Sequence, residues 1–328
     1  MAPLLEVKNL RIELITRDGV APVIDDLSFI LNAGETLSFV GESGCGKSMT
    51  ALALMGLLPE KVGRVASGSI IFNDENLAQA SNDRMRAIRG NDISMIFQEP
   101  MTSLNPVFTI GEQIAEVLRA HQALSRKAAW SQAIELLDAV RIPNAKGRVS
   151  DYPFQMSGGQ RQRAMIAMAL ACRPKILIAD EPTTALDVTV QAQIFDLLSD
   201  LRQQTGAAII LITHDMGAVA EMAERMIVMY AGRKAELGPV DQIIDRPRHP
   251  YTKGLIECVP HIQDDPSSER HNLVEVPGIV PSLREFGKDQ CLFASRCPYV
   301  TETCLKSRPV AKQFKNDQSA DCWHAEAL

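Results

Sequence analysis

The chain has 328 residues, of which 46% are hydrophobic and 23% charged, and its formal net charge is −6. This composition is ordinary for a folded protein of about two domains and excludes a long disordered chain. The acidic balance and the lack of a long basic run argue against nucleic acid as a partner. The longest apolar run, Ala164–Cys172, is too short to cross a membrane, and the N-terminus lacks the pattern of a signal peptide. We therefore expect a cytosolic protein whose contact with a membrane, if it has one, is made through a partner.

Short apolar runs alternate with helical patterns over the first 250 residues, which predicts buried strands separated by helices. The predicted strands are Thr36–Val40, Ile93–Phe97, Lys175–Asp180 and Ala207–Thr213. The predicted helices are Lys47–Leu58, Ile110–Ala120, Lys127–Val140, Gln160–Ala171 and Thr189–Gln203. This order predicts an α/β fold with a mainly parallel sheet. The interval between Phe97 and Lys175 holds helices without a convincing strand and predicts a helical insertion into that core.

A glycine-rich turn follows the first predicted strand and fits the pattern G-x-x-x-x-G-K-[ST] at every defined position. Its glycines allow successive backbone N–H groups to point into one concavity, and the helix that follows presents its N-terminus to the same anion. We expect Lys47 to reach the β- and γ-phosphates and Ser48 to offer its hydroxyl to Mg²⁺. The predicted ATP-binding residues are Gly41, Glu42, Ser43, Gly44, Cys45, Gly46, Lys47, Ser48 and Met49.

Two adjacent acids close the predicted strand Lys175–Asp180. Because open α/β sheets bind ligands at the carboxyl ends of their strands, Asp180 is placed to hold Mg²⁺. Glu181 is placed to orient the attacking water or accept its proton. The alternative is a solvated strand end without chemistry.

Four further motifs accompany the phosphate loop and the acidic pair. Gln98 closes a predicted strand, Ser157-Gly158-Gly159-Gln160 opens a predicted helix, Asp187 follows the acidic pair, and His214 follows the last predicted strand. In this order and spacing the motifs resemble those of the ABC-type ATPases over about residues 4–250. The resemblance implies a P-loop ABC core, with a RecA-like sheet and an antiparallel β subdomain, that carries a helical subdomain.

The resemblance also implies roles for these residues. Ser157, Gly158, Gly159 and Gln160 form the signature, which caps the γ-phosphate of ATP bound to the opposite subunit of a head-to-tail dimer. Asp187 lies in the D-loop. Gln98 contacts Mg²⁺ or the attacking water and links the site to the helical insertion, and His214 holds the γ-phosphate.

The sequence departs from the family pattern at two places near the phosphate loop. The stretch where an aromatic residue often stacks on adenine reads Glu13-Leu14-Ile15-Thr16, so the base is expected to pack on Leu14 or Val23. Cys45 stands where many relatives carry serine. Its place before a helix N-terminus suggests an acidic, reactive thiol.

Segments outside the common motifs resemble the dipeptide/oligopeptide/nickel importer branch. These segments are Glu99–Pro106, Ala185–Gln193, Arg248–Thr252, Val276–Leu283 and Arg296–Pro298. We expect a nucleotide-binding domain over residues 1–255, with the helical insertion at about 99–172. Residues 256–328 are expected to form a small, irregular, cysteine-rich extension, reached through a polar linker at Pro260–Asn272.

Four of the seven cysteines gather near the C-terminus with the spacing C-x5-C-x6-C-x17-C, at Cys291, Cys297, Cys304 and Cys322. Four thiolates can hold a [4Fe–4S] cluster, and a proline after a ligand cysteine is common at such sites. Members of the family with this tail are implied to carry one. Zinc and ordinary thiols remain alternatives, and His324 could replace a cysteine but is expected to be a surface residue.

We predict from this resemblance the ATP-hydrolysing subunit of an ABC importer of di- or oligopeptides, or of a related solute such as nickel, opines or sugars. Its implied cofactors are ATP and Mg²⁺. Its implied partners are two transmembrane permease subunits docked on the helical insertion near Gln98, an identical or paralogous ATPase subunit, and an extracytoplasmic solute-binding protein. It would lie on the cytoplasmic side of the inner membrane. The alternative is a non-transport ABC ATPase that acts on ribosomes or DNA. The short insertion and the negative net charge of the chain argue against this alternative.

Overall fold

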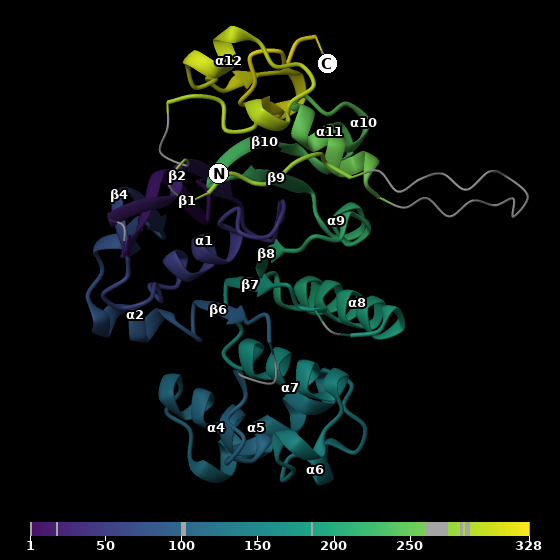
Figure 1. Cartoon of the computed structure of the whole chain (residues 1–328). Coiled ribbons are helices and arrows are strands. Elements are labelled where there is room, and N and C mark those ends of the chain that lie inside the picture. Colours follow the sequence, from purple (N-terminus) through teal and green to yellow (C-terminus); the bar gives the residue numbers. More distant parts are fainter. Residues whose placement is uncertain are drawn as a thin grey trace, which may run out of the picture.

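A central eight-stranded sheet organises the chain. The computed structural model describes residues 2–17, 19–99, 103–184, 186–259, 275–282, 285 and 289–327. Figure 1 shows the sheet running through the middle of the molecule, with helices α4–α7 at one end and the C-terminal extension at the other. The strand order is β11-β12-β10-β9-β3-β8-β7-β6, and the five strands from β9 to β6 are parallel. This confirms the predicted α/β fold.

Four strands of the central sheet, β3, β6, β7 and β8, agree with prediction within one residue at each end. The other four strands of this sheet were not predicted. Its strands are β3 (Thr36–Val40), β6 (Ile93–Ile96), β7 (Ile176–Asp180), β8 (Ala208–Ile212), β9 (Arg225–Tyr230), β10 (Arg233–Pro239), β11 (Lys312–Gln313) and β12 (Ser319–Ala320). The residues of β3, β7 and β8 are all buried, which explains their unbroken apolar character.

A second, antiparallel sheet packs beside the first, as the family resemblance implies. It has the order β2-β1-β4-β5, from β1 (Leu5–Thr16), β2 (Gly19–Leu31), β4 (Gly63–Phe72) and β5 (Glu75–Asn76). Its buried face forms one core with helix α1 and strands of the central sheet, including Leu10, Ile24 and Phe39. The antiparallel sheet therefore packs against both β3 and α1, the two elements that flank the phosphate loop.

Several helices begin at a capping side chain. Thr109 with Glu112 and Ser157 with Gln160 each form a capping box, at α4 and α7 respectively. The helices of the core and insertion are α1 (Lys47–Leu54), α2 (Asn82–Ile88), α4 (Ile110–His121), α5 (Arg126–Ala139), α6 (Ala145–Arg148), α7 (Gly158–Leu170), α8 (Val188–Thr205) and α9 (Met216–Met222). Those that follow are α10 (Val240–Asp245), α11 (Pro250–Glu257) and α12 (Glu302–Lys306).

Helix α1 is shorter than predicted, because Gly56 takes a φ of +60° just beyond its end. Among the described residues between β6 and β7, the chain forms helices and no strand, as expected for the insertion. The predicted linker Pro260–Asn272 lies outside the described residues. No helix in the described ranges has both the length and the apolar character needed to cross a bilayer.

The C-terminal extension is more ordered than the sequence suggested. Strand β12 pairs antiparallel with β10 and adds itself and β11 to the central sheet. The side chain of Gln318 donates to the buried carboxylate of Glu236 at 2.8 Å and to the Arg246 carbonyl at 2.9 Å. The division into residues 1–255 and 256–328 stays a prediction, and α11 spans that boundary.

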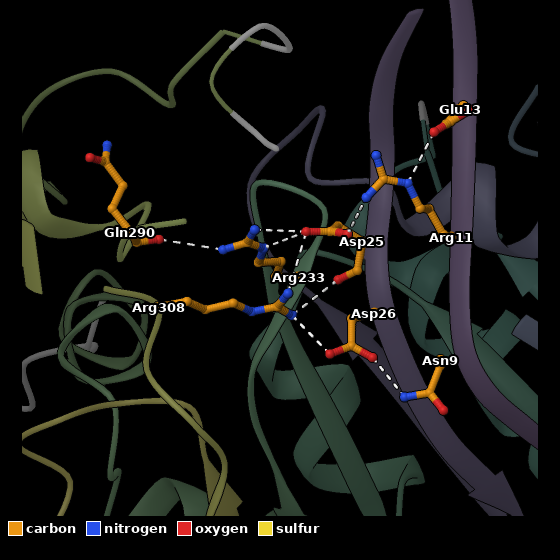
Figure 2. A network of polar contacts seen from close by, with 8 residues as sticks. All are labelled: Asn9, Arg11, Glu13, Asp25, Asp26, Arg233, Gln290 and Arg308. Atoms are coloured by element: carbon orange, nitrogen blue, oxygen red, sulfur yellow. Dashed lines mark hydrogen bonds and ion pairs between the residues drawn. The ribbon is translucent and has the colours of Figure 1, made fainter. Parts of the chain in front are cut away.

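An arginine cluster around Asp25 ties the extension to both sheets (Figure 2). The Asp25 carboxylate accepts from Arg11 at 2.9 Å and from Arg233 of β10 at 2.7 Å, and Arg308 of the extension lies 3.5 Å away. Arg308 also donates to Asp26 at 3.2 Å. Asp25 is only 8% exposed, so this buried carboxylate neutralises guanidinium groups from three parts of the chain.

Replacing Asp25 by Asn should destabilise the whole chain by about 2 kcal/mol, because Arg11 and Arg233 would lose the buried negative charge that they share. The midpoint of unfolding in guanidinium measures this effect. Asp26→Asn is the matched control. Its side chain is 47% exposed, and its loss should cost less than about 0.5 kcal/mol. Equal midpoints for the two variants would contradict the central position of Asp25.

Candidate nucleotide site

Four neighbouring parallel strands deliver the predicted motifs to one edge of the sheet. The phosphate loop follows β3, His214 follows β8, Asp180 and Glu181 close β7, and Gln98 follows β6. These strands are adjacent in the order β3-β8-β7-β6. Because parallel strands end at the same edge, side chains that are distant in sequence meet there.

The glycines of the phosphate loop allow two close backbone approaches. A Cβ on Gly41 would lie 2.3 Å from the carbonyl oxygen of Met229, and Gly41 has a φ of +150°. A Cβ on Gly46, which has a φ of +103°, would lie 2.4 Å from a carbon of Ile24. The loop can therefore take this path only with glycine at both positions.

Lys47 is folded into the loop. Its ammonium group donates to the carbonyl oxygens of Gly41 at 2.6 Å and Glu42 at 3.2 Å, and the residue is only 6% exposed. A buried cation held by neutral carbonyls is a strong attractor for an anion. A phosphate in the loop would therefore meet a positive charge at its centre.

Ser48 and Asp180, which the sequence predicts to hold Mg²⁺, lie together. The Ser48 hydroxyl lies 3.1 Å from a carboxylate oxygen of Asp180. Burial raises the pKa of Asp180, and the nearby Glu181 raises it further, whereas the hydrogen bond from Ser48 lowers it. A hydroxyl beside a buried carboxylate is an oxygen donor set that suits Mg²⁺.

Glu181 gathers the remaining polar groups of the site. One of its carboxylate oxygens accepts from Gln98 at 2.8 Å and from the Thr184 hydroxyl at 2.9 Å. The other oxygen lies 3.7 Å from Nδ1 of His214. Glu181 has a φ of +45°, a region that costs free energy for a residue with a side chain. The structure therefore brings together Gln98, Glu181 and His214, as the motifs predict.

A cavity of about 550 Å³ opens beside the loop, a size typical of small-molecule sites. Its polar lining includes Lys47, Ser48, Gln98 and Glu181, and its apolar lining includes Leu14 and Val23. Among its described lining residues none is aromatic, in agreement with the missing ring in the sequence. Two further apolar residues, Val280 and Pro281, come from the extension.

Comparison with known proteins decides the family. Residues 24–184 match the family described as ABC transporter, and residues 235–304 match the family described as oligopeptide/dipeptide transporter, C-terminal region. The oligopeptide transport ATP-binding protein OppD of Haemophilus influenzae is 51% identical over 323 residues, which cover 98% of each chain. The chain belongs to the ABC transporter ATP-binding proteins of the oligopeptide/dipeptide family.

Other relatives and solved structures agree. A probable peptide ABC transporter ATP-binding protein of Sinorhizobium fredii is 48% identical and covers 99% of this chain and 96% of its own. The dimeric ATP-binding cassette MJ0796, solved in a post-hydrolysis state with ADP and Pi, has a TM-score of 0.65 at 27% identity. It covers 72% of this chain and 98% of its own. This ABC ATPase therefore has the cassette fold of an ATP-hydrolysing family.

The signature of this ABC ATPase lies away from its own phosphate loop. Ser157 caps α7 and is exposed together with Gly158. The signature packs on the D-loop instead, since a Cβ on Gly158 would lie 3.7 Å from Leu186, and one on Gly159 would lie 3.0 Å from Val190. Asp187 caps α8 by accepting from the Val190 N–H at 2.9 Å. Among the described lining residues of the 550 Å³ cavity, none belongs to the signature.

The expectation of a reactive Cys45 is wrong. Cys45 is 1% exposed, and burial raises the pKa of its thiol, an effect that outweighs the opposing charge of Lys47. The helix N-terminus lies nearby, but the thiol belongs to a buried apolar cluster that also includes Ile24 and Leu54, and it accepts a hydrogen bond from the Lys47 ammonium at 3.7 Å. Position in the motif did not reveal how deeply the side chain is buried.

The four C-terminal cysteines lie close enough to influence one another. Burial, and secondarily the thiols of Cys304, Cys322 and Cys297, raise the pKa of Cys291 to about 11. The ring of His324 lies 3.7 Å from the Cys304 sulfur and is half-buried, not a free surface group. However, no group of three or more His, Cys, Asp or Glu side chains in the described ranges is arranged to hold a metal ion. The [4Fe–4S] cluster stays a prediction.

The structure also shows site residues whose roles the sequence did not reveal. Tyr251 is fully buried, and its hydroxyl accepts from the backbone N–H of Glu42 at 2.8 Å. Arg296 of the extension donates to the Glu42 carboxylate at 2.7 and 3.0 Å. Both residues lie in segments whose sequence resembles the importer branch, and this resemblance was the only signal for them. Nothing in the sequence indicated that they lie at the phosphate loop.

Native protein treated with iodoacetamide should leave Cys45 unmodified, because its thiol is buried and protonated at neutral pH. Cys258, which is half-buried beside a second cavity, serves as the internal comparison and should be modified faster. Mass spectrometry of the digested protein measures both. Faster labelling of Cys45, slowed by ATP, would contradict the buried position of its thiol.

Proposed function

We propose that the chain is the ATP-hydrolysing subunit of a peptide importer. The observation that carries this proposal is the meeting of Gln98, Glu181 and His214, with Gln98 and Glu181 lining the same cavity as the buried Lys47. The proton acceptor Glu181, the polar groups that orient the reactants and the cation that binds phosphate lie close together there. This is the arrangement that phosphoryl transfer to water needs.

In the proposed reaction the phosphates of ATP bind in the loop Gly41–Met49. Lys47 exchanges its carbonyl contacts for phosphate oxygens. Ser48 and Asp180, with Gln98, would hold Mg²⁺, which when bound neutralises the charge that develops on the phosphate oxygens. Glu181 orients the attacking water and accepts its proton, while the exposed His214 holds the γ-phosphate from the other side.

The signature would complete a second site in trans. Ser157 and Gly158 lie exposed at the N-terminus of α7, with Gly159 and Gln160 half-buried beside them, and backbone N–H groups and the helix dipole attract an anion there. We propose that they cap the γ-phosphate bound by a second ATPase subunit, identical or paralogous. ATP binding would then close the pair and hydrolysis would reopen it.

Coupling to the membrane would run through the helical insertion. Gln98 follows Phe97, which is 38% exposed, and Val107 and Phe108 before α4 are also exposed. A groove of about 230 Å³ on α4 and α5 includes Phe108 and Trp130. We propose this surface as the docking site of two transmembrane permease subunits, which places the protein peripherally on the cytoplasmic side of the inner membrane.

The relatives favour an importer over the alternative of a non-transport ATPase acting on ribosomes or DNA, because those named above carry peptide-transport names and match nearly the full chain. An extracytoplasmic binding protein would select the solute, for which we propose di- or oligopeptides. The match to the oligopeptide/dipeptide C-terminal region supports this choice.

Glu181→Gln should bind ATP normally but lower the hydrolysis rate about a thousandfold, because an amide cannot accept the proton of the attacking water. Phosphate release measures turnover, and uptake of labelled peptide by cells carrying the variant should fall with it. Glu221→Gln, the same substitution at an exposed position of α9, is the control and should leave both unchanged. Turnover at the wild-type rate in Glu181→Gln would refute the assigned role.

We also propose a [4Fe–4S] cluster held by Cys291, Cys297, Cys304 and Cys322. Thiols that are buried or half-buried and close to one another, with pKa values raised to about 11 at Cys291 and Cys322, are costly to ionise without a cation to bind them. Thiolates are the ligands that such clusters prefer. When bound, the cluster would cross-link the extension, and its loss should loosen the extension more than the ATPase core.

Protein purified without oxygen should contain about four iron and four sulfide ions per chain and should absorb visible light. Cys297→Ser should lose most of this iron. Cys258→Ser, which changes a cysteine outside the group, should keep it. Folded, iron-free protein from anaerobic preparations would contradict the cluster.

A further inference from the structure

A short segment of the extension lies at the nucleotide cavity. We call residues 276–282 the strap. Val280 and Pro281 of the strap line the same cavity as Lys47 and Ser48 of the phosphate loop, although they are more than 230 positions away in the chain. The cavity is thus closed in part by residues from outside the cassette core.

The strap is anchored by one buried arginine. Nε of Arg296 donates to the Pro277 carbonyl at 2.6 Å, and Nη2 donates to the Val276 carbonyl at 3.0 Å. Gly278, with a φ of +81°, lets the strap pass over the arginine, since a Cβ there would lie 3.1 Å from Cγ of Arg296. The backbone of the strap is therefore shaped around this side chain.

The same arginine is tied to the phosphate loop. Its Nη1 and Nη2 atoms donate to the two carboxylate oxygens of Glu42 at 2.7 and 3.0 Å, and Nη1 also donates to the Tyr230 hydroxyl at 3.3 Å. With the two strap carbonyls, five acceptors match the five N–H donors of a guanidinium group. The Arg296 side chain is only 2% exposed, and lysine could not replace it in this geometry.

Two kinds of side chain line the cavity. Lys47, Ser48, Gln98 and Glu181 are polar or charged, which suits the phosphates and metal. The remaining part of a nucleotide is its sugar and its flat, apolar base. The apolar side chains available to receive the base are Leu14 and Val23 from β1 and β2, Met49 from α1, and Val280 and Pro281 from the strap.

We propose that the strap forms one wall of the base-binding pocket and that Arg296 is the positioning residue that holds this wall against the phosphate loop. In this proposal, which rests on nucleotide binding at that loop, the base packs on Val280 and Pro281 as well as on Leu14 and Val23. These contacts take the place of a single stacking ring. The extension is then part of the ATP site, so a change in its fold changes ATP affinity.

Tripolyphosphate distinguishes binding of the phosphates from binding of the base, because it has the phosphates of ATP but no base. In full-length protein carrying Glu181→Gln, we expect the double variant Val280→Ser/Pro281→Ser to weaken ATP binding about fivefold in calorimetric titration. The affinity for tripolyphosphate should stay within twofold of the parent. Ile279→Ser is the matched control, since Ile279 lies in the same strap but is 88% exposed, and it should change neither affinity.

Three results would overturn the proposal: unchanged ATP affinity in the double variant, equal losses for ATP and tripolyphosphate, or an effect of Ile279→Ser as large as that of the double variant. A failure of tripolyphosphate to bind even the parent protein would instead count against the phosphate site itself. Photolabelling of otherwise unchanged protein with 8-azido-ATP tests the wall without a variant in the strap. The label should appear within residues 276–282, and its absence there would also overturn the proposal.

Arg296→Lys tests whether Arg296 positions the strap. At equal nucleotide occupancy, labelling of the strap by 8-azido-ATP should fall several-fold, because three ammonium donors cannot serve five acceptors. A purely structural role would not change the distribution of label along the chain. Unchanged labelling of the strap would remove Arg296 from the proposal.

Discussion

The structure depends on the parallel alignment of β3, β8, β7 and β6. Since these strands end at the same edge, each strand delivers one part of the site there: phosphate loop, histidine, acidic pair and glutamine. No single segment could hold these groups together by local structure. The buried strands stabilise the sheet, and the polar groups at its edge remain accessible to a ligand.

A second constraint is the burial of charged side chains where the extension meets the core. Asp25 compensates arginines from both sheets and the extension, and Arg296 compensates Glu42 of the phosphate loop. Each contact is stabilising only while its partners stay in place, because an unpaired buried charge is costly. The extension and the cassette are therefore coupled mechanically as well as through the pairing of β12 with β10.

The sequence predicted the parts of the fold that are encoded locally. The continuous apolar runs of β3 and β7 and the capped helix α7 were found within one or two residues, and the motifs that follow β3 and β7 meet as expected. The reactivity of Cys45 was predicted wrongly, because its burial depends on a core cluster whose other members, such as Ile24, are distant from it in sequence. The contact between Arg296 and Glu42 spans 254 positions, and no spacing rule could reveal it.

The central claim is that one cavity binds ATP with its phosphates in the loop and its base against the strap. Hydrogen–deuterium exchange of the full chain, measured with and without ATP, tests this claim most directly. We expect ATP to slow amide exchange both in Gly41–Met49 and in residues 276–282, with tripolyphosphate slowing only the former. Unchanged exchange in the phosphate loop with saturating ATP would contradict the account.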